Sequence, residues 1–351
     1  MTDIKSLPLP ILNEALAAAG EKPYRAMQIY EWLHKHLVQS FEEMTNIPKA
    51  SRAYLANHFS FPVVTMAKFQ ESSLDGTRKF LFALSDGHFI ESVFMKYRHG
   101  NSVCISSQVG CRMGCMFCAS TIGGLARSLT AGEMLEQVYA VTRHTKERVS
   151  NVVVMGIGEP LDNYEELLNF IKILSDENGL HISMRNITVS TCGLIPEIYR
   201  LADEMLQINL AISLHAATDE KRIRLMPIAK AYPLTELMAA CQYYFMKTGR
   251  RITFEYSLMN DVNDSKEDAM ALKDLLIKFK RKNHHIHDIP CHVNLIPLNP
   301  VKERDFCATA KKNALDFKNT LEKNQINVTI RREMGSDINS ACGQLRFIAM
   351  Q

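Results

Sequence analysis

The chain has 351 residues, of which 46% are hydrophobic and 23% are charged, and its formal net charge is +3. This composition is typical of a globular protein, and no apolar run approaches the roughly 18 residues that a membrane span requires. The N-terminus also lacks a positive region followed by an apolar core. We therefore expect a cytoplasmic protein without a signal peptide or a membrane span.

The first hundred residues differ in pattern from the rest of the chain. Residues 11–58 carry apolar residues at helical spacing, which predicts helices. Residues 61–106 predict antiparallel strands with a hairpin that turns at Ser85-Asp86-Gly87, because Asp-Gly between two β-rich runs favours a tight turn. We infer a small accessory domain over residues 1–97, which is a candidate for binding RNA.

From about residue 102, short β-rich runs alternate with amphipathic stretches. The runs are mostly unbroken and apolar, which is typical of strands buried on both faces of a parallel sheet. This alternation predicts an α/β core over residues 98–334, and six or so units favour a partial (β/α)6 barrel over a closed eight-stranded one. The predicted strands are 103–106, 151–155, 186–190, 207–215, 251–256, 292–297 and 326–331.

Three of the nine cysteines, Cys111, Cys115 and Cys118, form a C-x3-C-x2-C motif. Three thiolates on a tight loop can bind three irons of a [4Fe–4S] cluster and leave the fourth iron open. An open iron can chelate the amino and carboxylate groups of S-adenosylmethionine (SAM). A zinc knuckle is the alternative, but zinc prefers four ligands, and no fourth with suitable spacing lies nearby.

The other unusual motifs also follow predicted strands, and in a βα barrel the loops after the strands share one face. Gly156-Ile-Gly158-Glu159-Pro160 follows the second strand, where paired glycines allow close backbone approach. A tight turn is the simpler interpretation, and a carboxylate facing the amino group of SAM is the functional one. Phe117, between the last two motif cysteines, is expected to pack beside the adenine of SAM. The remaining candidates are polar residues that follow strands, and each of them alone is more often a satisfied polar group or a turn residue than a ligand: Ser190, Ser213, His215 and Asn299.

Two further cysteines and one glutamate stand apart from these motifs. Cys342 lies in the segment 335–351, after a glycine-containing loop on the expected active face. A lone cysteine is usually a small buried hydrophobe, and a redox or nucleophilic role with Cys104 as partner is the alternative. Glu91 alternates with apolar neighbours, so a solvent-facing position is its simplest interpretation. We interpret the other cysteines as structural or incidental: Cys192, Cys241, Cys291 and Cys307.

The charge of the chain is unevenly distributed. Residues 271–332 contain 13 Lys and Arg against 6 Asp and Glu, a local net charge of +7. Within this stretch, residues 278–287 hold four basic side chains and three histidines: Lys278, Lys280, Arg281, Lys282, His284, His285 and His287. A solvated helix face is the simpler interpretation, and a footprint for an RNA backbone is the alternative.

Taken together, these motifs resemble those of the RlmN/Cfr family of radical SAM RNA methyltransferases. The resemblance covers nearly the whole chain, from PYRAMQIYEW through SSQVGCRMGCMFCAST, GIGEPLDN, STCG and SLHA to IRREMGSDINSACGQL. It is specific, because C-x3-C-x2-C together with a C-terminal ACGQL is not a general feature of radical SAM enzymes.

The resemblance implies one [4Fe–4S] cluster per chain and two SAM molecules per turnover. One SAM would methylate Cys342, and the second would start a radical that adds the methyl carbon to an adenine. Cys104 would then attack Cys342 and release the RNA, leaving a transient disulfide, and Glu91 would be the proton acceptor. The residues that match SAM contacts or line the site are Met155, Gly158, Glu159, Ser190, Ser213, Leu214, His215 and Asn299.

Within the family, Pro160 after Glu159 resembles RlmN-like members, which methylate adenine C2, rather than Cfr-like members, which methylate C8 and confer antibiotic resistance. The implied substrates are an adenine in the peptidyl transferase centre of 23S rRNA and the adenine 3′ to the anticodon in tRNA. We also expect a low-potential electron donor such as flavodoxin, and a monomer. The rival functions are a zinc-containing RNA-binding module and a glycyl-radical activating enzyme, which would share the cysteine motif without needing Cys342.

Overall fold

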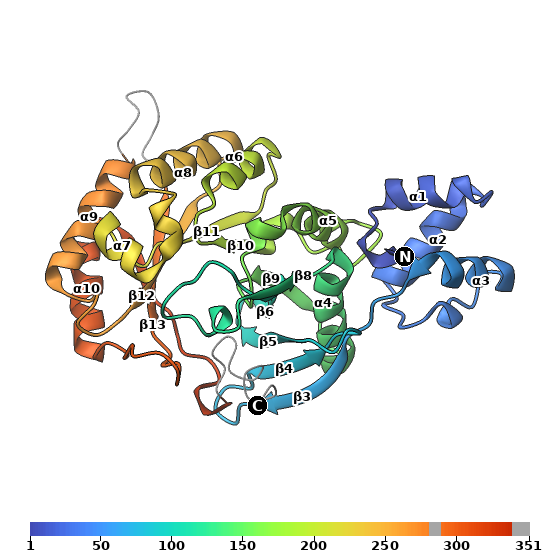
Figure 1. Ribbon diagram of the computed structural model, residues 1–351, viewed down its shortest axis with the longest axis horizontal. Coiled ribbons are helices and arrows are strands. Elements are labelled where there is room, and N and C mark those ends of the chain that lie inside the picture. Colours follow the sequence, from blue (N-terminus) through green and yellow to red (C-terminus); the bar gives the residue numbers. More distant parts are fainter. Residues whose placement is uncertain (281–288, 339–351) are drawn as a thin grey trace.

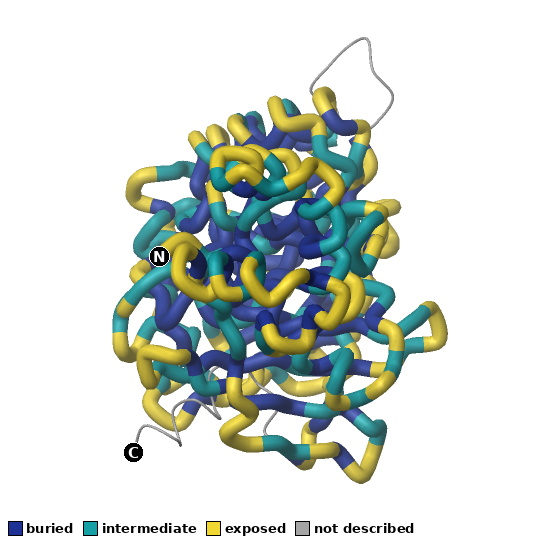
Figure 2. The backbone as a smooth tube through the Cα atoms, turned by 90° about the vertical axis from the view of Figure 1, so that its right-hand side faces the viewer, coloured by how far each residue is buried: buried dark blue, intermediate teal, exposed yellow. Residues whose placement is uncertain are grey.

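The structure is a computed structural model and describes residues 1–280 and 289–338. Figure 1 shows short helices at the N-terminal end beside a larger body in which helices cover a central sheet. Figure 2 shows that the buried residues concentrate in the interior of that body. Cys342 and the basic residues Arg281 and Lys282 lie outside the described residues.

The helices and strands follow the order that the sequence predicts. The α-helices are α1 Leu9–Ala18, α2 Pro23–His34, α3 Lys49–His58, α4 Ala131–Thr145, α5 Tyr164–Ser175, α6 Ile195–Asp203, α7 Asp219–Leu225, α8 Leu234–Thr248, α9 Lys266–Lys280 and α10 Lys311–Lys323. The strands are β1 Thr2–Asp3, β2 Phe59–Ser60, β3 Thr65–Glu71, β4 Arg78–Ala83, β5 Phe89–Tyr97, β6 Gly100–Ile105, β7 Gln108–Gly110, β8 Leu125–Ser128, β9 Val149–Val154, β10 Ile187–Thr191, β11 Asn209–Ser213, β12 Ile252–Leu258, β13 Cys291–Pro297 and β14 Asn327–Ile330. Among the described helices, none is long and apolar enough to cross a bilayer.

Ten strands form one mixed sheet in the order β14-β13-β12-β11-β10-β9-β6-β5-β4-β3. Neighbours from β6 to β14 pair in parallel, and each of the six connections between them contains a helix. The sheet has free edges at β14 and β3 and is therefore open. The predicted α/β fold with a partial barrel of six units is confirmed.

The parallel strands are apolar on both faces because both faces are covered. Leu210, Ala211 and Ile212 are consecutive residues of β11, so their side chains point to alternate faces, and all three are fully buried. Figure 1 shows helices packed around the outside of the parallel strands. The polar residues that matter for function are displaced to the strand ends. The carboxyl ends of parallel strands meet at one edge of the sheet, so the loops that follow them are gathered there.

The three antiparallel strands β3–β5 extend the same sheet. The predicted hairpin joins β4 to β5, with Gly87 at φ 83° and Leu84 N–H donating to the His88 carbonyl at 2.8 Å. β5 then pairs with β6, so the hairpin lies directly beside the first parallel strand. The division of the chain into units at residues 1–97, 98–334 and 335–351 stays a prediction.

The N-terminal segment is attached to the start of α4 by buried polar contacts. Lys5 forms an ion pair with Glu136 of α4, and both side chains are fully buried. Asp3 accepts a hydrogen bond from the Thr130 hydroxyl at 2.6 Å, and Thr130 with Glu133 forms the capping box of α4. Removing one partner of a buried ion pair typically costs about 3–5 kcal/mol, so these contacts fix α1–α3 to the body.

Candidate active site

The three motif cysteines lie on one loop between β7 and a short 3-10 turn at Ala119–Thr121. Cys111 N–H donates to the Gly124 carbonyl at 2.9 Å, and the Thr121 hydroxyl donates to the carbonyls of Cys115 and Cys118 at 3.0 and 2.9 Å. Gly110 enters the loop at φ 80°, where an added Cβ would lie 1.9 Å from the Gly124 carbonyl oxygen. The loop is therefore tightly closed, as a three-thiolate site requires.

The three thiols line one cavity of about 170 Å³, which we name the cysteine cavity. The other predicted site residues on its wall are Phe117, Met155, Gly158, Glu159, Ser190, Ser213 and His215. Within the described residues, no three His, Cys, Asp or Glu side chains converge closely enough to hold a single metal ion. The cysteines instead surround a shared space, which suits a cluster because each of its irons takes its own thiolate.

Glu159 is a buried carboxylate on the wall of the cysteine cavity, 3% exposed. One oxygen accepts from Leu161 N–H at 3.1 Å, and the other accepts from Cys192 N–H at 2.8 Å. Burial raises the pKa of Glu159, and these hydrogen bonds oppose that effect. Gly158, at φ 110°, lets the loop approach β7, because an added Cβ would lie 2.6 Å from the Cβ of Gln108.

His215 sits at the end of β11 in a left-handed backbone conformation, with φ 54°. Burial, followed by the nearby charge of Arg222, lowers the pKa of His215 to about 3, so the ring is neutral at physiological pH. Its Nδ1 accepts from Ser257 N–H at 2.9 Å, which leaves the ring proton on Nε2. The edge of the ring meets Phe117, with the centroids 4.9 Å apart, and Leu214 beside it is fully buried.

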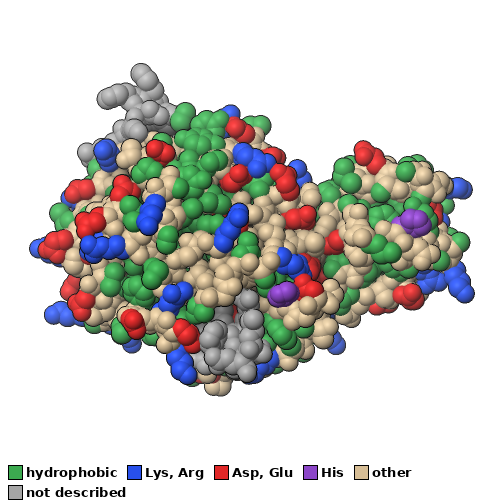
Figure 3. Space-filling view, in the orientation of Figure 1, with side chains coloured by type: hydrophobic (Ala, Val, Ile, Leu, Met, Phe, Trp, Pro, Cys, Tyr) green, Lys and Arg blue, Asp and Glu red, His purple; other side chains and the backbone are tan. Residues whose placement is uncertain are grey.

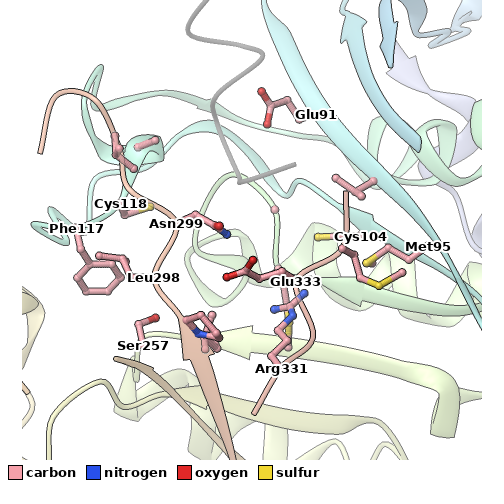
Figure 4. A pocket seen from close by; sticks show the side chains of 18 of the residues that line it. Glu91, Met95, Cys104, Phe117, Cys118, Ser257, Leu298, Asn299, Arg331 and Glu333 are labelled. Carbon is pink, nitrogen blue, oxygen red and sulfur yellow. The ribbon is translucent and has the colours of Figure 1, made fainter. Parts of the chain in front are cut away.

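A second cavity, of about 260 Å³, adjoins the first and shares Phe117, Cys118, Met155 and Gly156 with it. We name it the Glu91 cavity, because Glu91 lines it together with Cys104 and Asn299. Figure 4 draws Phe117 and Cys118 on one side of this space and Cys104 on the other. The predicted catalytic residues that the structure describes are thus brought together beside the cysteine motif.

Glu91 does not face solvent, so the simpler interpretation of this residue is wrong. It lies on β5 and is only 3% exposed, and its Oε2 is 3.4 Å from the ammonium nitrogen of Lys79, which is fully buried. Lys79 comes from the neighbouring strand β4, close to Glu91 across the β4–β5 pairing. A buried carboxylate without a positive partner would be costly; the lysine therefore allows an ionised Glu91 inside the protein.

Cys104 lies on β6 and lines the Glu91 cavity. Burial raises the pKa of the Cys104 thiol, and the positive charge of Arg331 and a hydrogen bond with the Met155 backbone partly oppose that rise. Arg331 follows directly after β14 and lines the same cavity. A residue at the edge strand of the sheet therefore partly offsets the effect of burial on Cys104.

The chain that leads toward Cys342 passes along the Glu91 cavity. Residues 331–334 line it, and the following residues are fastened to the turn between β3 and β4. Asp337 accepts from the Ser72 hydroxyl at 2.6 Å and from Ser73 N–H at 2.9 Å, and Gly335 N–H donates to Asp75 at 2.9 Å. Cys342 itself lies outside the described residues, so its place relative to Cys104 stays a prediction.

Comparison with known proteins agrees with this arrangement. The profile of the Radical SAM superfamily matches residues 105–272, and the profile of the ribosomal RNA large subunit methyltransferase N-terminal domain matches residues 2–60. A probable dual-specificity RNA methyltransferase RlmN from Lachnoclostridium phytofermentans is 57% identical over 344 residues, which cover 98% of this chain and 94% of that one. The chain belongs to the RlmN family of radical SAM RNA methyltransferases.

Two further matches extend over almost the whole length of the chain. The RlmN protein of Lachnospira eligens is 56% identical over 346 residues, or 99% of this chain and 96% of that one. The crystal structure of a radical SAM methyltransferase from Sphaerobacter thermophilus superposes with a TM-score of 0.90 at 43% identity, covering 98% of this chain and 99% of that chain. The RlmN family fold therefore includes the N-terminal helices as well as the barrel.

Radical SAM enzymes use a [4Fe–4S] cluster and SAM, and the cysteine cavity of this RlmN family member fits both. Burial raises the pKa of Cys111 to about 12 and also raises that of Cys115, whose ionisation is further opposed by the charges of Cys118 and Cys111. Thiols such as Cys111 and Cys115 become thiolates when positive iron replaces their protons. Glu159 and neutral His215, on the same wall, offer a carboxylate and a ring N–H to a zwitterionic ligand.

Four residues were not found from the sequence: Cys192 and Arg331 line the two cavities, and Lys79 and Arg222 lie beside them. Cys192, interpreted as structural or incidental, lines the cysteine cavity. Lys79, Arg331 and Arg222 place positive charge around the site. The sequence did contain a sign that Lys79 is buried, because this lysine lies within the apolar predicted strand RKFLFAL. Arg222 lies in the charged run DEKRIRL, where nothing in the pattern distinguishes it from a solvated residue.

The described part of the basic run lies away from the cavities. Lys278 and Lys280 are at the end of α9, and the Lys280 ammonium donates to the Gln325 carbonyl just before β14 begins, whereas Arg331 follows the end of that strand. The run is thus at the opposite end of the strands from the site. On the face drawn in Figure 3, basic and acidic side chains are interspersed rather than gathered by sign.

Proposed function

We propose that this protein methylates C2 of one adenine in the peptidyl transferase centre of 23S rRNA, and of the adenine 3′ to the anticodon in tRNA. The observation that carries the proposal is the adjacency of the two cavities, which share Phe117, Cys118 and Met155. RNA as the substrate is supported by the names of the relatives and by the match of residues 2–60 to a ribosomal RNA methyltransferase domain.

In this proposal the cysteine cavity binds SAM beside one cluster held by Cys111, Cys115 and Cys118. When bound, the cluster supplies the electron that cleaves SAM, and a low-potential protein such as flavodoxin would deliver that electron. Glu159 accepts hydrogen bonds from the amino group of SAM, and Phe117 packs beside its adenine. The other residues proposed to bind SAM or to line its site are Met155, Gly158, Ser190, Ser213, Leu214, His215 and Asn299.

The Glu91 cavity would receive the target adenine, and its residues complete the transfer. Cys342 carries the methyl group, which a first SAM supplies, and a second SAM is used for the radical step. The radical formed from the second SAM would take one hydrogen atom from this methyl group and leave as 5′-deoxyadenosine, and the remaining carbon radical would add to C2. The adduct would then give its unpaired electron back to the oxidised cluster as Glu91 accepts the proton from C2. The Cys104 thiolate then bonds to the Cys342 sulfur as the carbon–sulfur bond breaks, and the carbon keeps that electron pair and takes a proton to become the methyl group.

A base can reach this cavity only after it leaves its stack, because a chamber of about 260 Å³ admits one base and not a duplex. RNA-binding proteins that recognise single bases bind them in loops and at other unpaired positions, where little free energy is needed to unstack the base. The peptidyl transferase centre and the anticodon loop both offer such bases. The proposed target classes are therefore consistent with the size of the cavity and with its position at the carboxyl ends of the strands.

The Cfr-type alternative would place the methyl group on C8 of adenine, and it is not favoured, because the relatives carry the RlmN name. The deciding experiment is mass spectrometry of nucleosides from 23S rRNA and tRNA of cells that lack and then regain this gene. We expect 2-methyladenosine to disappear from both RNAs and to return. Detection of 8-methyladenosine, or no change in either RNA, would overturn the proposal.

A further inference from the structure

Arg222 is a charged residue at the centre of the protein. It lies on α7 and is fully buried, and it is the largest side chain buried to that extent in the described structure. Its guanidinium donates to three backbone carbonyls, those of Cys192 at 2.6 Å, Leu214 at 3.3 Å and Tyr232 at 3.4 Å. Two of these carbonyls follow the ends of β10 and β11, so the side chain reaches the edge of the sheet where the cavities lie.

The charge of Arg222 has no carboxylate partner within the described residues, since none of its hydrogen bonds and no salt bridge joins it to Asp or Glu. An arginine is always protonated under physiological conditions, and an isolated buried cation costs several kcal/mol unless an anion compensates it. Asp219, one turn earlier on α7, acts on Arg222 through its charge without a hydrogen bond or an ion pair to it. The groups on the cavity side that can become anionic and act on Arg222 are the thiols of Cys192 and Cys115, which line the cysteine cavity.

The same helix also holds the loop that carries the motif cysteines. The Leu225 carbonyl at the end of α7 accepts from Met116 N–H at 2.9 Å, and Met116 lies between Cys115 and Cys118. One turn earlier on the helix, Arg222 bonds to the Cys192 carbonyl, while Cys192 N–H donates to Glu159. α7 therefore fixes the position of a positive charge relative to the cysteine loop.

We propose that Arg222 is the fixed counter-cation of the cluster bound by Cys111, Cys115 and Cys118, and that its charge raises the reduction potential of that cluster. The inference rests on the cluster that the proposed function requires. Reduction adds one negative charge to an already anionic group, and a fixed positive charge in a low-dielectric interior stabilises the reduced state more than the oxidised one. Arg222 is thus a positioning residue that acts through its charge and touches no substrate.

The test compares three variants of the reconstituted protein in the absence of RNA and SAM. Arg222→Gln removes the charge, and Arg222→Lys keeps it while losing the planar set of donors. Arg224→Gln is the matched control, because Arg224 lies on the same helix but is exposed and pairs with Glu220. The readout is the midpoint potential of the cluster from a redox titration followed by electron paramagnetic resonance, with iron content and circular dichroism as checks of assembly and folding.

We expect Arg222→Gln to lower the equilibrium ratio of reduced to oxidised cluster at least tenfold at a given potential, a shift of 59 mV for a one-electron couple. Arg222→Lys should stay nearer the wild-type value, and Arg224→Gln should match it. A wild-type midpoint in an assembled Arg222→Gln protein would overturn the proposal. Equal shifts in the Gln and Lys variants would also overturn it, because hydrogen bonding and not charge would then be responsible.

The outcome remains decisive if the neutral variant fails to assemble. Cluster assembly in Arg222→Lys but not in Arg222→Gln supports the proposal, since charge is what the two variants do not share. Failure of both variants would contradict it and leave Arg222 as a structural donor to the strand ends. A wild-type protein that binds no cluster at all would instead overturn the proposed function, so the two failures are distinguishable.

Discussion

The two cavities differ in how their charges are balanced. In the cysteine cavity, Glu159 is a buried carboxylate held by backbone N–H groups, and Arg222 behind the wall is a buried cation with no salt bridge to a carboxylate among the described residues. In the Glu91 cavity, the buried carboxylate of Glu91 is already paired with Lys79. Within the described residues, the first cavity therefore presents buried charges that no oppositely charged side chain pairs. In the second, a lysine balances the buried carboxylate, and the remaining charged residues of the wall are Arg331, Arg332 and Glu333.

The difference between the two cavities also indicates in which cavity each step of the proposed reaction would occur. Cleavage of SAM requires an anionic cluster and a zwitterionic ligand, and both fit the first cavity. Methyl transfer to a base requires a proton acceptor and a thiol, which are Glu91 and Cys104 on the wall of the second. Phe117, Cys118 and Met155 are common to both walls, so the two steps would take place at adjoining positions.

Removing a motif cysteine should have the largest effect, because the three thiolates act as a unit. We expect Cys115→Ala to abolish the broad visible absorption of the reconstituted protein and all formation of 5′-deoxyadenosine from SAM. Cys307→Ser is the matched control, since Cys307 is exposed, and it should retain both. Near-normal iron content and SAM cleavage in Cys115→Ala would show that the cysteine cavity is not the cluster site.

Breaking the charge pair in the second cavity should slow methylation without affecting SAM cleavage. Lys79→Met leaves a buried carboxylate without its counter-charge, which favours the protonated form that cannot accept a proton. We expect release of methylated RNA to slow by about tenfold or more at neutral pH, and Lys79→Arg to restore the rate.

The control for that variant is Lys96→Met. Lys96 lies on β5, as Glu91 does, but it is partly exposed and pairs with Glu147 at 2.7 Å, so its loss should leave the rate of RNA release unchanged. Breaking a buried pair also costs roughly 3–5 kcal/mol of stability, and thermal unfolding would report that loss separately. A Lys79→Met protein that folds and releases RNA at the wild-type rate would remove Lys79 from the proton-transfer account.

His215 should add no pH dependence to ligand binding in the first cavity. The pKa of His215 is lowered to about 3 by burial, so the ring does not change its charge across the neutral range. We expect the affinity of the reconstituted protein for SAM, measured by equilibrium binding, to show no inflection from the histidine. Burial raises the pKa of Glu159, so a fall in affinity at acidic pH should follow that carboxyl. An inflection near the ordinary pKa of histidine would contradict this and would place solvent at His215.

The smallest effect is expected at the end of α9. If Lys278 and Lys280 contact an RNA backbone, their substitution by glutamate should weaken the salt dependence of RNA binding. The slope of the logarithm of the binding constant against the logarithm of the salt concentration should fall in magnitude by about 0.7–0.9 for each lost phosphate contact. Their position at the opposite end of the strands from both cavities favours an unchanged slope, because the bound base enters at the carboxyl ends. A reduced slope would instead support the RNA footprint and extend the bound RNA around the barrel.

The two cavities also differ in how far the sequence predicts them. The cysteine cavity comes largely from one continuous motif and from residues at the ends of apolar strands, and both have strong local patterns. The Glu91 cavity joins β4, β5 and β6 to the chain that follows β14, and such long-range proximity has no local pattern. The burial of Glu91 depends on its pairing with Lys79, which only the register of β4 with β5 brings close.

Arg222 shows a different reason for a failed prediction. Its surroundings in the sequence, DEKRIRL, are typical of an exposed helix, and its neighbours Glu220 and Arg224 are in fact exposed. Only the packing of α7 against the ends of β10 and β11 buries Arg222 on the same helix. A tertiary contact of this kind overrides the local pattern, and no pattern of charges in the sequence indicates it.

The measurement that tests the central claim most directly is a search for protein covalently bound to RNA in Cys104→Ala. This variant can still join the methyl carbon of Cys342 to adenine but lacks the thiolate that frees the product. We predict a protein band of reduced electrophoretic mobility. Nuclease digestion should remove this shift and leave only a small mass increase on the peptide that contains Cys342. Cys342→Ala should show no such band. Normal turnover by Cys104→Ala, or trapped RNA in Cys342→Ala, would contradict the account.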